Sequence, residues 1–263
     1  MIHFEPREAA SEWLSLVDTT PAMVFDPQVC RAQWAGLSQA LPGVDLFYAV
    51  KSNPYPELLS TLAAEGAQFD VASAAEIRML ESVGVGASRM IHTHPIKTDA
   101  EIERAVASGV TTFVVDNVDE LWKLIPYRHA IRVMLRLSFI APDAPIDLSK
   151  KFGAMPKDAL SILDVANDSG IRVDGLCFHV GSQAASAYTH AEALAHCLKL
   201  CEAILAEELP PIQRIDIGGG FPAHYLNDPI DLMTFCAPIR EVLQTVPDGM
   251  QIMAEPGRVI SAP

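Results

Sequence analysis

Short apolar runs alternate with longer amphipathic stretches over most of the chain. The runs are rich in β-branched and aromatic residues, as buried strands are, and the stretches between them repeat their apolar positions with helical spacing. Eight strands are predicted, at Leu46–Lys51, Gln68–Ala72, Arg89–Thr93, Thr111–Asp116, Ile131–Phe139, Gly175–Val180, Arg214–Ile217 and Gln251–Ala254. Helices are predicted between them, at Pro56–Glu65, Ala74–Val83, Asp99–Ser108, Val118–Ile125, Pro156–Ser169, Ala187–Glu207 and Asp231–Thr245.

This alternation is typical of an α/β protein with a parallel sheet. A strand followed by a helix forms one βα unit, and eight such units fit a closed (β/α)8 barrel of the TIM type. The alternative architecture is an open, doubly wound sheet. It is less favoured because no Gly-x-Gly-x-x-Gly turn follows the first strand.

Both ends of the chain carry elements that the eight units do not use. A helix at Pro27–Ala40 is expected to close the outer ring, because no helix follows the eighth strand. Before it, a helix at Glu8–Val17 and a short strand at Ala22–Phe25 are predicted, and this strand has no partner in the barrel. The final residues Val259–Ala262 are expected to open a further strand.

Composition narrows the class of protein. The chain has 263 residues, of which 50% are hydrophobic, yet no apolar run reaches membrane-spanning length and the N-terminus does not resemble a signal peptide. The 5 cysteines have no disulfide-like spacing, so a reducing cytoplasm is expected. The net charge of −14 argues against a nucleic-acid partner and is compatible with a cationic small substrate.

The candidate chemistry lies where the strands end, because active sites of such barrels are built at the carboxyl ends of the strands. Lys51 closes the first strand and is followed by turn-forming residues. An amine in an apolar, partly dry position loses its proton more easily and often forms a Schiff base with a carbonyl compound. The alternative, which position alone favours, is a surface lysine whose stem lies over apolar residues.

A run of three glycines, Gly218–Gly220, follows the seventh strand. Glycines allow the tight backbone conformations in which several amide groups converge on an anion. The loops after the seventh and eighth strands form the usual phosphate site of these barrels, and Gly257 and Arg258 lie in the second of them. The alternative interpretation of the three glycines is a flexible turn.

Glu255 ends the eighth strand, which lies beside the first strand and Lys51 when the barrel closes. A lysine, a glycine nest and a carboxylate are what an aldehyde-bearing pyridine with a phosphate arm requires. Pyridoxal phosphate fits this description, since an acidic partner at its ring nitrogen makes the ring an electron sink. His179, at the end of the sixth strand, could cover one face of that ring; otherwise it is a hydrogen-bonded core histidine.

These motifs, in this order, resemble the fold-type III pyridoxal-phosphate decarboxylases, which act on ornithine, diaminopimelate or arginine and share an alanine racemase-like barrel. The likeness runs from about Thr20 to Arg258. It implies a lyase of polyamine biosynthesis that decarboxylates a basic amino acid of the ornithine or lysine type. The segments around Pro95 and Lys97 and at Lys151–Ala154 look closer to ornithine-type members, although His94 stands where an asparagine is common.

The resemblance also assigns residues to the site. Lys51 would carry the cofactor, Glu255 would pair with the ring nitrogen, and His179 would stack on the ring. The full set implied to contact the cofactor is Lys51, Asp70, Arg136, His179, Ser182, Gly218, Gly219, Gly220, Glu255, Gly257 and Arg258. Within this set Ser182, the glycines and Arg258 would hold the phosphate, and Glu76 would lie behind Asp70.

Members of this family continue beyond the Glu-Pro-Gly-Arg motif into a β-domain, and we expect this chain to lack it. That domain supplies a proton-handling cysteine and substrate-binding acids, partly across a dimer interface, and Cys236 does not match that motif. We therefore divide the chain into an N-terminal segment at 1–26, which would pack on the β-domain, and a barrel at 27–263. A homodimer, or pairing with a separate β-domain, is expected.

Two other functions stay open. One is a barrel that binds pyridoxal phosphate without turnover, as a homeostasis protein or a regulatory relative. The other is a metal-dependent hydrolase in which His92, His94 and His179 bind zinc. It is less favoured because such barrels carry their His-x-His on the first strand. His196 with Cys197 and Cys201 fits a buried helical face better than a metal site, so no metal is expected.

Overall fold

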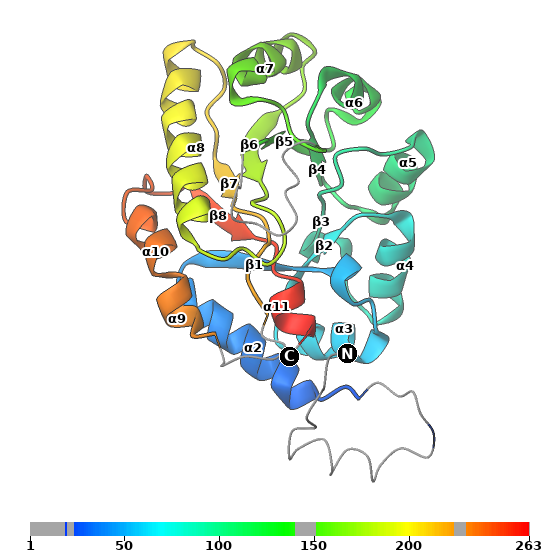
Figure 1. The fold of residues 1–263 in the computed structure, drawn as a ribbon. Coiled ribbons are helices and arrows are strands. Elements are labelled where there is room, and N and C mark those ends of the chain that lie inside the picture. The colour runs from blue at the N-terminus through cyan, green and yellow to red at the C-terminus, as the bar shows by residue number, and fades with distance from the viewer. Residues whose placement is uncertain (1–18, 20–23, 140–150, 224–229, 263) are drawn as a thin grey trace.

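A computed structural model of the protein describes residue 19 and residues 24–139, 151–223 and 230–262. Eight parallel strands pair in sequence order and close into a barrel (Figure 1). They are β1 (Val44–Ala49), β2 (Gln68–Val71), β3 (Met90–His92), β4 (Thr112–Val115), β5 (Arg132–Leu137), β6 (Val173–Phe178), β7 (Arg214–Asp216) and β8 (Gln251–Ala254). The predicted (β/α)8 barrel is therefore confirmed.

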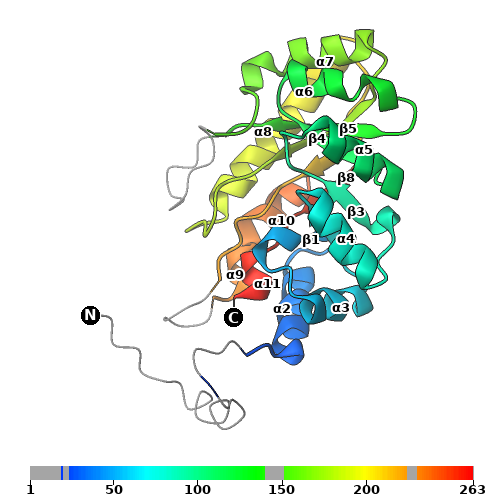
Figure 2. The ribbon, with the colours of Figure 1, turned by 90° about the vertical axis from the view of Figure 1, so that its right-hand side faces the viewer.

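Helices surround the strands on the outside, as two perpendicular views show (Figures 1 and 2). The α-helices are α2 (Pro27–Ala40), α3 (Pro56–Ala64), α4 (Ala74–Ser82), α5 (Asp99–Ser108), α6 (Val118–Lys123), α7 (Ala159–Asp168), α8 (Tyr188–Ala206), α9 (Leu232–Phe235), α10 (Ala237–Leu243) and α11 (Arg258–Ser261). Short 3₁₀ turns lie at η1 (Val50–Ser52), η2 (Ala87–Arg89), η3 (Ile125–Tyr127) and η4 (Pro156–Asp158). Among the described residues, none of the helices has both the length and the hydrophobicity that a membrane span requires.

Local chemistry explains where the helices begin and end. Thr98 and Glu101 form a reciprocal capping box at the start of α5, and Gly109 ends that helix in a left-handed conformation.

The helix predicted over Asp231–Thr245 is instead two helices, α9 and α10. Pro238 lies in the first turn of α10, where a residue without an N–H is tolerated but the preceding helix cannot continue.

The outer ring is completed from the N-terminal side of the barrel. Helix α2 contacts both α3 and α9, so it occupies the position expected for the helix Pro27–Ala40. The helix expected at Glu8–Val17 and the first half of the strand expected at Ala22–Phe25 lie outside the described residues. Val24 and Phe25 are described and belong to no strand, and Phe25 packs edge-on against Tyr55.

The strand expected at Val259–Ala262 is wrong. This segment is the short helix α11, in which Ile260 and Ser261 donate backbone hydrogen bonds to Gly257. One helical turn buries both Val259 and Ile260, and α11 packs against α2. In an extended strand, successive side chains point to opposite faces. Val259 and Ile260 could then not both pack against the same helix.

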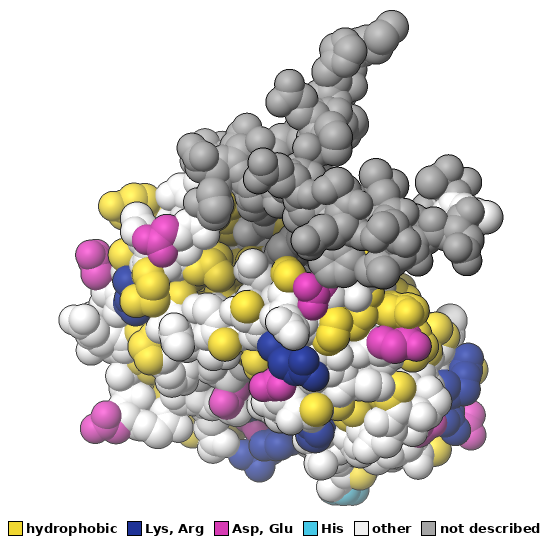
Figure 3. Space-filling model, turned by 90° about the horizontal axis from the view of Figure 1, so that it is seen from below, with side chains coloured by type: hydrophobic (Ala, Val, Ile, Leu, Met, Phe, Trp, Pro, Cys, Tyr) yellow, Lys and Arg dark blue, Asp and Glu magenta, His cyan; other side chains and the backbone are white. Residues whose placement is uncertain are grey.

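The interior of the barrel is layered. A middle layer is apolar, and its members are Phe47, Ile91, Val114, Met134, Cys177 and Met253. The other faces of the strands pack against the helices in one large core. Outside, hydrophobic side chains are scattered among charged ones on the face seen in Figure 3.

A polar plug fills the amino-terminal end of the barrel below this layer. The carboxylate of Asp174 is buried and accepts hydrogen bonds from the guanidinium of Arg214, which is itself buried. Arg172 and Arg132 approach the second oxygen of Asp174 at 3.6 and 3.9 Å. Arg214 also donates to Thr112 at 3.2 Å. One carboxylate thus compensates a cation that would otherwise be buried alone.

Removing this carboxylate should destabilise the fold. The Asp174→Ala variant leaves the Arg214 guanidinium buried without its partner, and breaking a buried ion pair in this way costs about 3–5 kcal/mol. The Arg172→Ala variant is the control, since that side chain is 54% exposed and should cost less than about 1 kcal/mol. Denaturant unfolding of both variants gives the comparison. A loss for Asp174→Ala no larger than for Arg172→Ala would contradict the assignment.

Candidate active site

Lys51 lies just beyond the end of β1, in the turn η1. The strand therefore ends at Ala49, two residues earlier than predicted. Two hydrogen bonds hold the chain where the strand ends: the Ala49 N–H donates to the Pro256 carbonyl at 2.9 Å, and the Ser52 hydroxyl donates to the Ala49 carbonyl at 2.8 Å. The turn holds the lysine at the carboxyl end of the barrel, where the sequence places it.

Two carboxylates surround the Lys51 ammonium. Its Nζ donates to Asp70 Oδ2 at 2.6 Å and lies 4.0 Å from Glu255 Oε2. Loss of bulk water around the amine would lower the pKa of Lys51, but Asp70 and Glu255 outweigh that effect and raise it above its usual value. The expectation of an easily deprotonated amine is therefore wrong for this arrangement, because its neighbours are acidic rather than apolar.

Asp70 is fixed from a second side. It is the third residue of β2, its side chain is fully buried, and its Oδ1 accepts a hydrogen bond from the hydroxyl of Thr93. Glu76 lies behind it in the first turn of α4, where its carboxylate accepts the Ala72 N–H at 2.6 Å. Burial raises the pKa of Glu76. Glu76 thus supports the loop after β2 and adds negative charge near Lys51.

Glu255 follows β8 and is 8% exposed. The pairing of Leu46 in β1 with Ala254 in β8 closes the barrel and brings this carboxyl beside Lys51, as the sequence argument expects. Burial raises the pKa of Glu255 well above its usual value, and the negative charges of Asp70 and Asp216 add to this.

The glycine loop approaches this site so closely that larger residues would not fit. A Cβ on Gly219 would lie 2.7 Å from the Glu255 carbonyl oxygen and 3.2 Å from Nε2 of His179. Gly220 has φ +96°, a conformation that other residues rarely adopt. The Ala184 N–H donates to the Gly220 carbonyl at 2.9 Å, which joins this loop to the loop that follows β6.

His179, the residue after β6, and Arg136, in β5, flank the site. Burial, together with the positive charges of Arg136 and Lys51, lowers the pKa of His179 to about 3, so its imidazole is neutral. Its Nδ1 accepts the Gly181 N–H at 2.9 Å, which fixes the orientation of the ring. The Arg136 guanidinium lies 5.2 Å from the centre of the Phe152 ring.

The remaining predicted residues lie in the loops around these groups. Ser182 is half-buried in the loop after His179. Gly257 packs against the turn that carries Lys51, where a Cβ would lie 2.9 Å from Cβ of Ser52. Arg258 is exposed at the start of α11. The structure thus brings the loops after β1, β6, β7 and β8 to one end of the barrel.

The two segments that resemble ornithine-type members, around Pro95 and Lys97 and at Lys151–Ala154, contact each other. The His94 ring lies edge-on to Phe152 at 5.6 Å. Lys97 is buried and donates to the carbonyls of Val114 at 2.6 Å and Pro95 at 2.9 Å. Burial lowers the pKa of Lys97 to about 8. Lys97 therefore ties the loop after β3 to β4, and Phe152 connects that loop to Arg136.

The histidines of the zinc hypothesis do not converge. His92 is fully buried and stacks on Phe113, with ring centres 5.8 Å apart, whereas His94 contacts Phe152. Burial lowers the pKa of His92 to about 4. In the part of the chain that the structure describes, no group of three or more His, Cys, Asp or Glu side chains could hold a metal.

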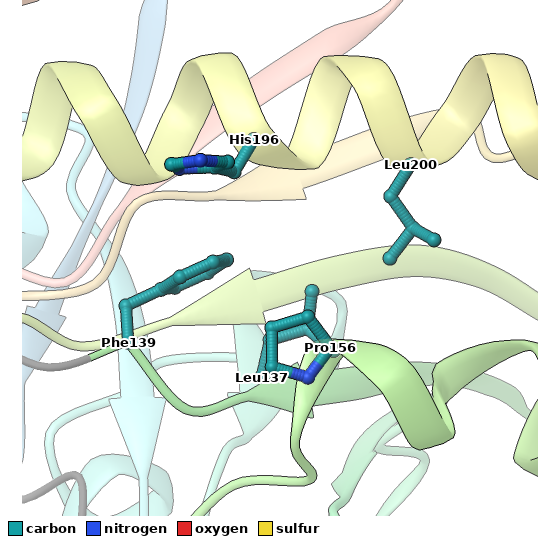
Figure 4. A pocket seen from close by; sticks show the side chains of 5 residues that line it. All are labelled: Leu137, Phe139, Pro156, His196 and Leu200. Carbon is teal, nitrogen blue, oxygen red and sulfur yellow. The ribbon is translucent and has the colours of Figure 1, made fainter.

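A pocket of about 300 Å³ lies elsewhere, on the outer side of β5 under α8 (Figure 4). His196 stacks on Phe139 there, with ring centres 5.9 Å apart, and Leu200 lies further along the same helix. Burial raises the pKa of the Cys197 thiol. Of the three residues for which the sequence favours a buried helical face, Cys197 is buried and Cys201 half-buried, whereas His196 is exposed.

Comparison with known proteins identifies the family. The profile of the family described as pyridoxal-dependent decarboxylase, pyridoxal binding domain, matches residues 28–262. The chain belongs to this family. Its cofactor is pyridoxal phosphate, and the described residues fit that group: they offer an amine beside two carboxylates, a glycine loop that side chains would fill, and a neutral imidazole.

Similar proteins are decarboxylases of basic amino acids. The chain is 35% identical over 262 residues to a lysine/ornithine decarboxylase of Selenomonas ruminantium, covering 98% of this chain and 66% of that protein. It is 37% identical over 226 residues to an ornithine decarboxylase of Caenorhabditis elegans, covering 84% of this chain and 53% of that protein. The chain thus spans between about half and two thirds of these relatives.

Solved structures show the same barrel. The lysine/ornithine decarboxylase of Vibrio vulnificus in complex with cadaverine superposes with a TM-score of 0.90 at 41% identity, covering 98% of this chain and 69% of that one. SrLDC in complex with PLP and cadaverine superposes with a TM-score of 0.86 at 32% identity, covering 99% of this chain and 66% of that one.

Sequence reasoning missed Thr93 and Asp216 as neighbours of the site. Both face inward at the carboxyl ends of their strands, Thr93 on Asp70 and Asp216 on Glu255. The alternation of inward and outward residues along β3 and β7 is the signal that could have found them. That signal is weak here, because β3 and β7 are each only 3 residues long.

The ion pair at Lys51 can be tested directly. In the Asp70→Asn variant the largest stabilising charge is gone, so the pKa of Lys51 should fall, by about 1–3 pH units for one adjacent opposite charge. Glu76→Gln is the control and should lower it less, because Glu76 is the weakest of the acidic neighbours. Nuclear magnetic resonance of ¹³C-methylated lysines would follow the titration. An unchanged titration of Lys51 in Asp70→Asn would contradict the ion pair.

Proposed function

We propose that this chain is the cofactor-binding barrel of a decarboxylase that converts a basic amino acid of the ornithine or lysine type to a diamine. The observation that carries the proposal is the position of Lys51 Nζ, 2.6 Å from Asp70 and 4.0 Å from Glu255, at the barrel end that bears the three-glycine loop. The names of its relatives support the substrate class.

In this proposal Lys51 holds the cofactor and Glu255 pairs with its ring nitrogen. Pyridoxal phosphate supplies an electron sink for the pair of electrons that carbon dioxide leaves behind. A carboxylate beside the ring nitrogen favours the protonated ring, which makes the sink effective. Asp70 orients Lys51 through their 2.6 Å hydrogen bond and compensates its charge until the amine is needed.

The phosphate would be held by Ser182, the loop Gly218–Gly220, Gly257 and Arg258. Backbone amides of a glycine-rich loop bind an anion without the cost of ordering long side chains. His179 would lie on one face of the ring, and its neutral imidazole suits stacking because it adds no charge beside an electron-poor ring. Arg136, held by Phe152, would supply positive charge on the ring side.

The substrate proposal rests on chemistry as well as on likeness. Two of the similar crystal structures contain cadaverine and putrescine, the diamines expected from lysine and ornithine. The net charge of −14 favours approach of a cation over that of an anion. All 5 cysteines are free thiols, which fits a reducing, cytoplasmic setting.

A partner is part of the proposal. The relatives are longer than this chain, which covers 66% and 53% of the two described above. We infer that turnover needs a second segment, supplied by a longer form of the chain, a homodimer or a separate β-domain. A barrel that binds the cofactor without turnover is the alternative outcome.

Cofactor attachment tests the role of Lys51. The Lys51→Ala variant should lose the visible absorbance that pyridoxal phosphate shows when bound, because no other amine lies between Asp70 and Glu255 among the described residues. Lys199→Ala, an exposed lysine on α8, is the matched control and should keep the full absorbance. If Lys51→Ala retains the spectrum of the unmodified protein, Lys51 is not the attachment site.

An amine-product assay tests turnover. The chain would be supplied with pyridoxal phosphate and a panel of ornithine, lysine and arginine, with and without a candidate β-domain. We expect a diamine from ornithine or lysine, at a rate that the added domain raises. Bound cofactor with no amine from any member of the panel, in either condition, would favour the barrel without turnover.

A further inference from the structure

Asp216 is a buried acid that the proposed function leaves without a role. It is the last residue of β7 and is fully buried. Its Oδ1 accepts the Gly218 N–H at 2.8 Å, but its Oδ2 has no donor among the described residues. A buried carboxylate oxygen without a donor is costly, so a proton or a partner is expected there.

The neighbouring group is the buried carboxyl of Glu255, which interacts with the Asp216 side chain. Backbone pairing places the two side chains: the Ile217 N–H donates to the Met253 carbonyl at 2.9 Å, and the Glu255 N–H donates to the Gly218 carbonyl at 2.8 Å. Both side chains therefore face the same end of the barrel interior, and both are buried. Two carboxylates cannot accept from each other, so a hydrogen bond between these side chains requires one proton.

We propose that Asp216 and Glu255 share one proton, and that Asp216 is a positioning residue that holds Glu255 and this proton for the ring nitrogen of the cofactor. The inference rests on the proposed pairing of Glu255 with that nitrogen. With a pyridine bound, the pair would supply this proton to the nitrogen lone pair. The charge of the pair would then change from −1 to −2 and the ring would gain +1, with no change of oxidation state.

The cationic groups around Asp216 and Glu255 would stabilise the additional negative charge. Burial raises the pKa of Asp216 to about 6, and burial together with Asp70 and Asp216 raises that of Glu255, so one proton stays on the pair near neutral pH. The titratable and charged groups that face the pair are Lys51 from η1, Asp70 from β2, Arg136 from β5 and Cys177 from β6. Two of these are cations, and they stabilise the pair once it has given up its proton.

Asp216→Asn is the discriminating variant. Gly218 N–H needs an acceptor, so the amide oxygen of the new side chain takes that position and its NH₂ turns to Glu255. The hydrogen bond between the two side chains is kept, but a donor now favours the ionised form of Glu255. The shared proton is thereby removed with little change in shape.

Infrared spectroscopy of the chain without cofactor gives the first readout. At neutral pH the unmodified chain should show a protonated-carboxyl C=O band that is absent in both Asp216→Asn and Glu255→Gln. Asp45→Asn, at the opposite end of β1 where Asp45 accepts a bond from Gln251, is the control and should leave the band intact. A band that Asp216→Asn leaves unchanged would overturn the shared proton, whether or not the chain binds cofactor. If Asp216→Asn does not fold, a band unaffected by Glu255→Gln overturns it equally.

Calorimetry of pyridoxal phosphate binding in buffers of different ionisation enthalpy gives the second readout. The Asp216→Asn variant should take up about one proton more from the buffer than the unmodified chain, because its pair no longer brings one to the site. Equal uptake by both, with cofactor bound in each, would overturn the transfer to the ring. Failure of the unmodified chain to bind pyridoxal phosphate would instead overturn the proposed function, while the infrared result would stand by itself.

Discussion

The parallel pairing of β1 with β8 is the constraint on which the site depends. Lys51 and Glu255 are far apart in the sequence, near the first and the last strand of the barrel. The pairing of Leu46 with Ala254 brings Lys51 Nζ to 4.0 Å from Glu255 Oε2. The same closure brings Pro256 into hydrogen-bonding distance of Ala49, which ends β1 and begins the turn that carries Lys51. The strand pair that closes the barrel therefore also brings the two site residues together.

The two ends of the barrel interior hold separate groups of charged side chains. At the amino-terminal end, Asp174 compensates the buried Arg214. At the carboxyl end, acidic side chains outnumber cationic ones around Lys51, and their negative charge keeps the amine protonated. Burial and mutual repulsion oppose the ionisation of both Glu255 and Asp216. The apolar layer between the ends separates the two groups of charges. The first group stabilises the fold, and the second prepares the site for a cofactor that itself carries charge.

The alternation of strands and helices could be predicted because it depends on local periodicity. Helix α5 and helix α2 were predicted residue for residue, since each has clear signals at both ends. Lys51 and Glu255 could be placed at strand ends for the same reason. The charge state of Lys51 could not, because it depends on the register that sets Asp70 beside it. Helix α11 was missed because its burial against α2 is a tertiary effect.

Covalent mapping of the cofactor tests the central claim most directly. The chain loaded with pyridoxal phosphate would be treated with borohydride, which makes the lysine linkage permanent, then digested and analysed by mass spectrometry. The geometry around Asp70 and Glu255 predicts a phosphopyridoxyl group on Lys51 and on no other lysine. Its presence on Lys97 or Lys151 instead, or its absence from every lysine, would contradict the account.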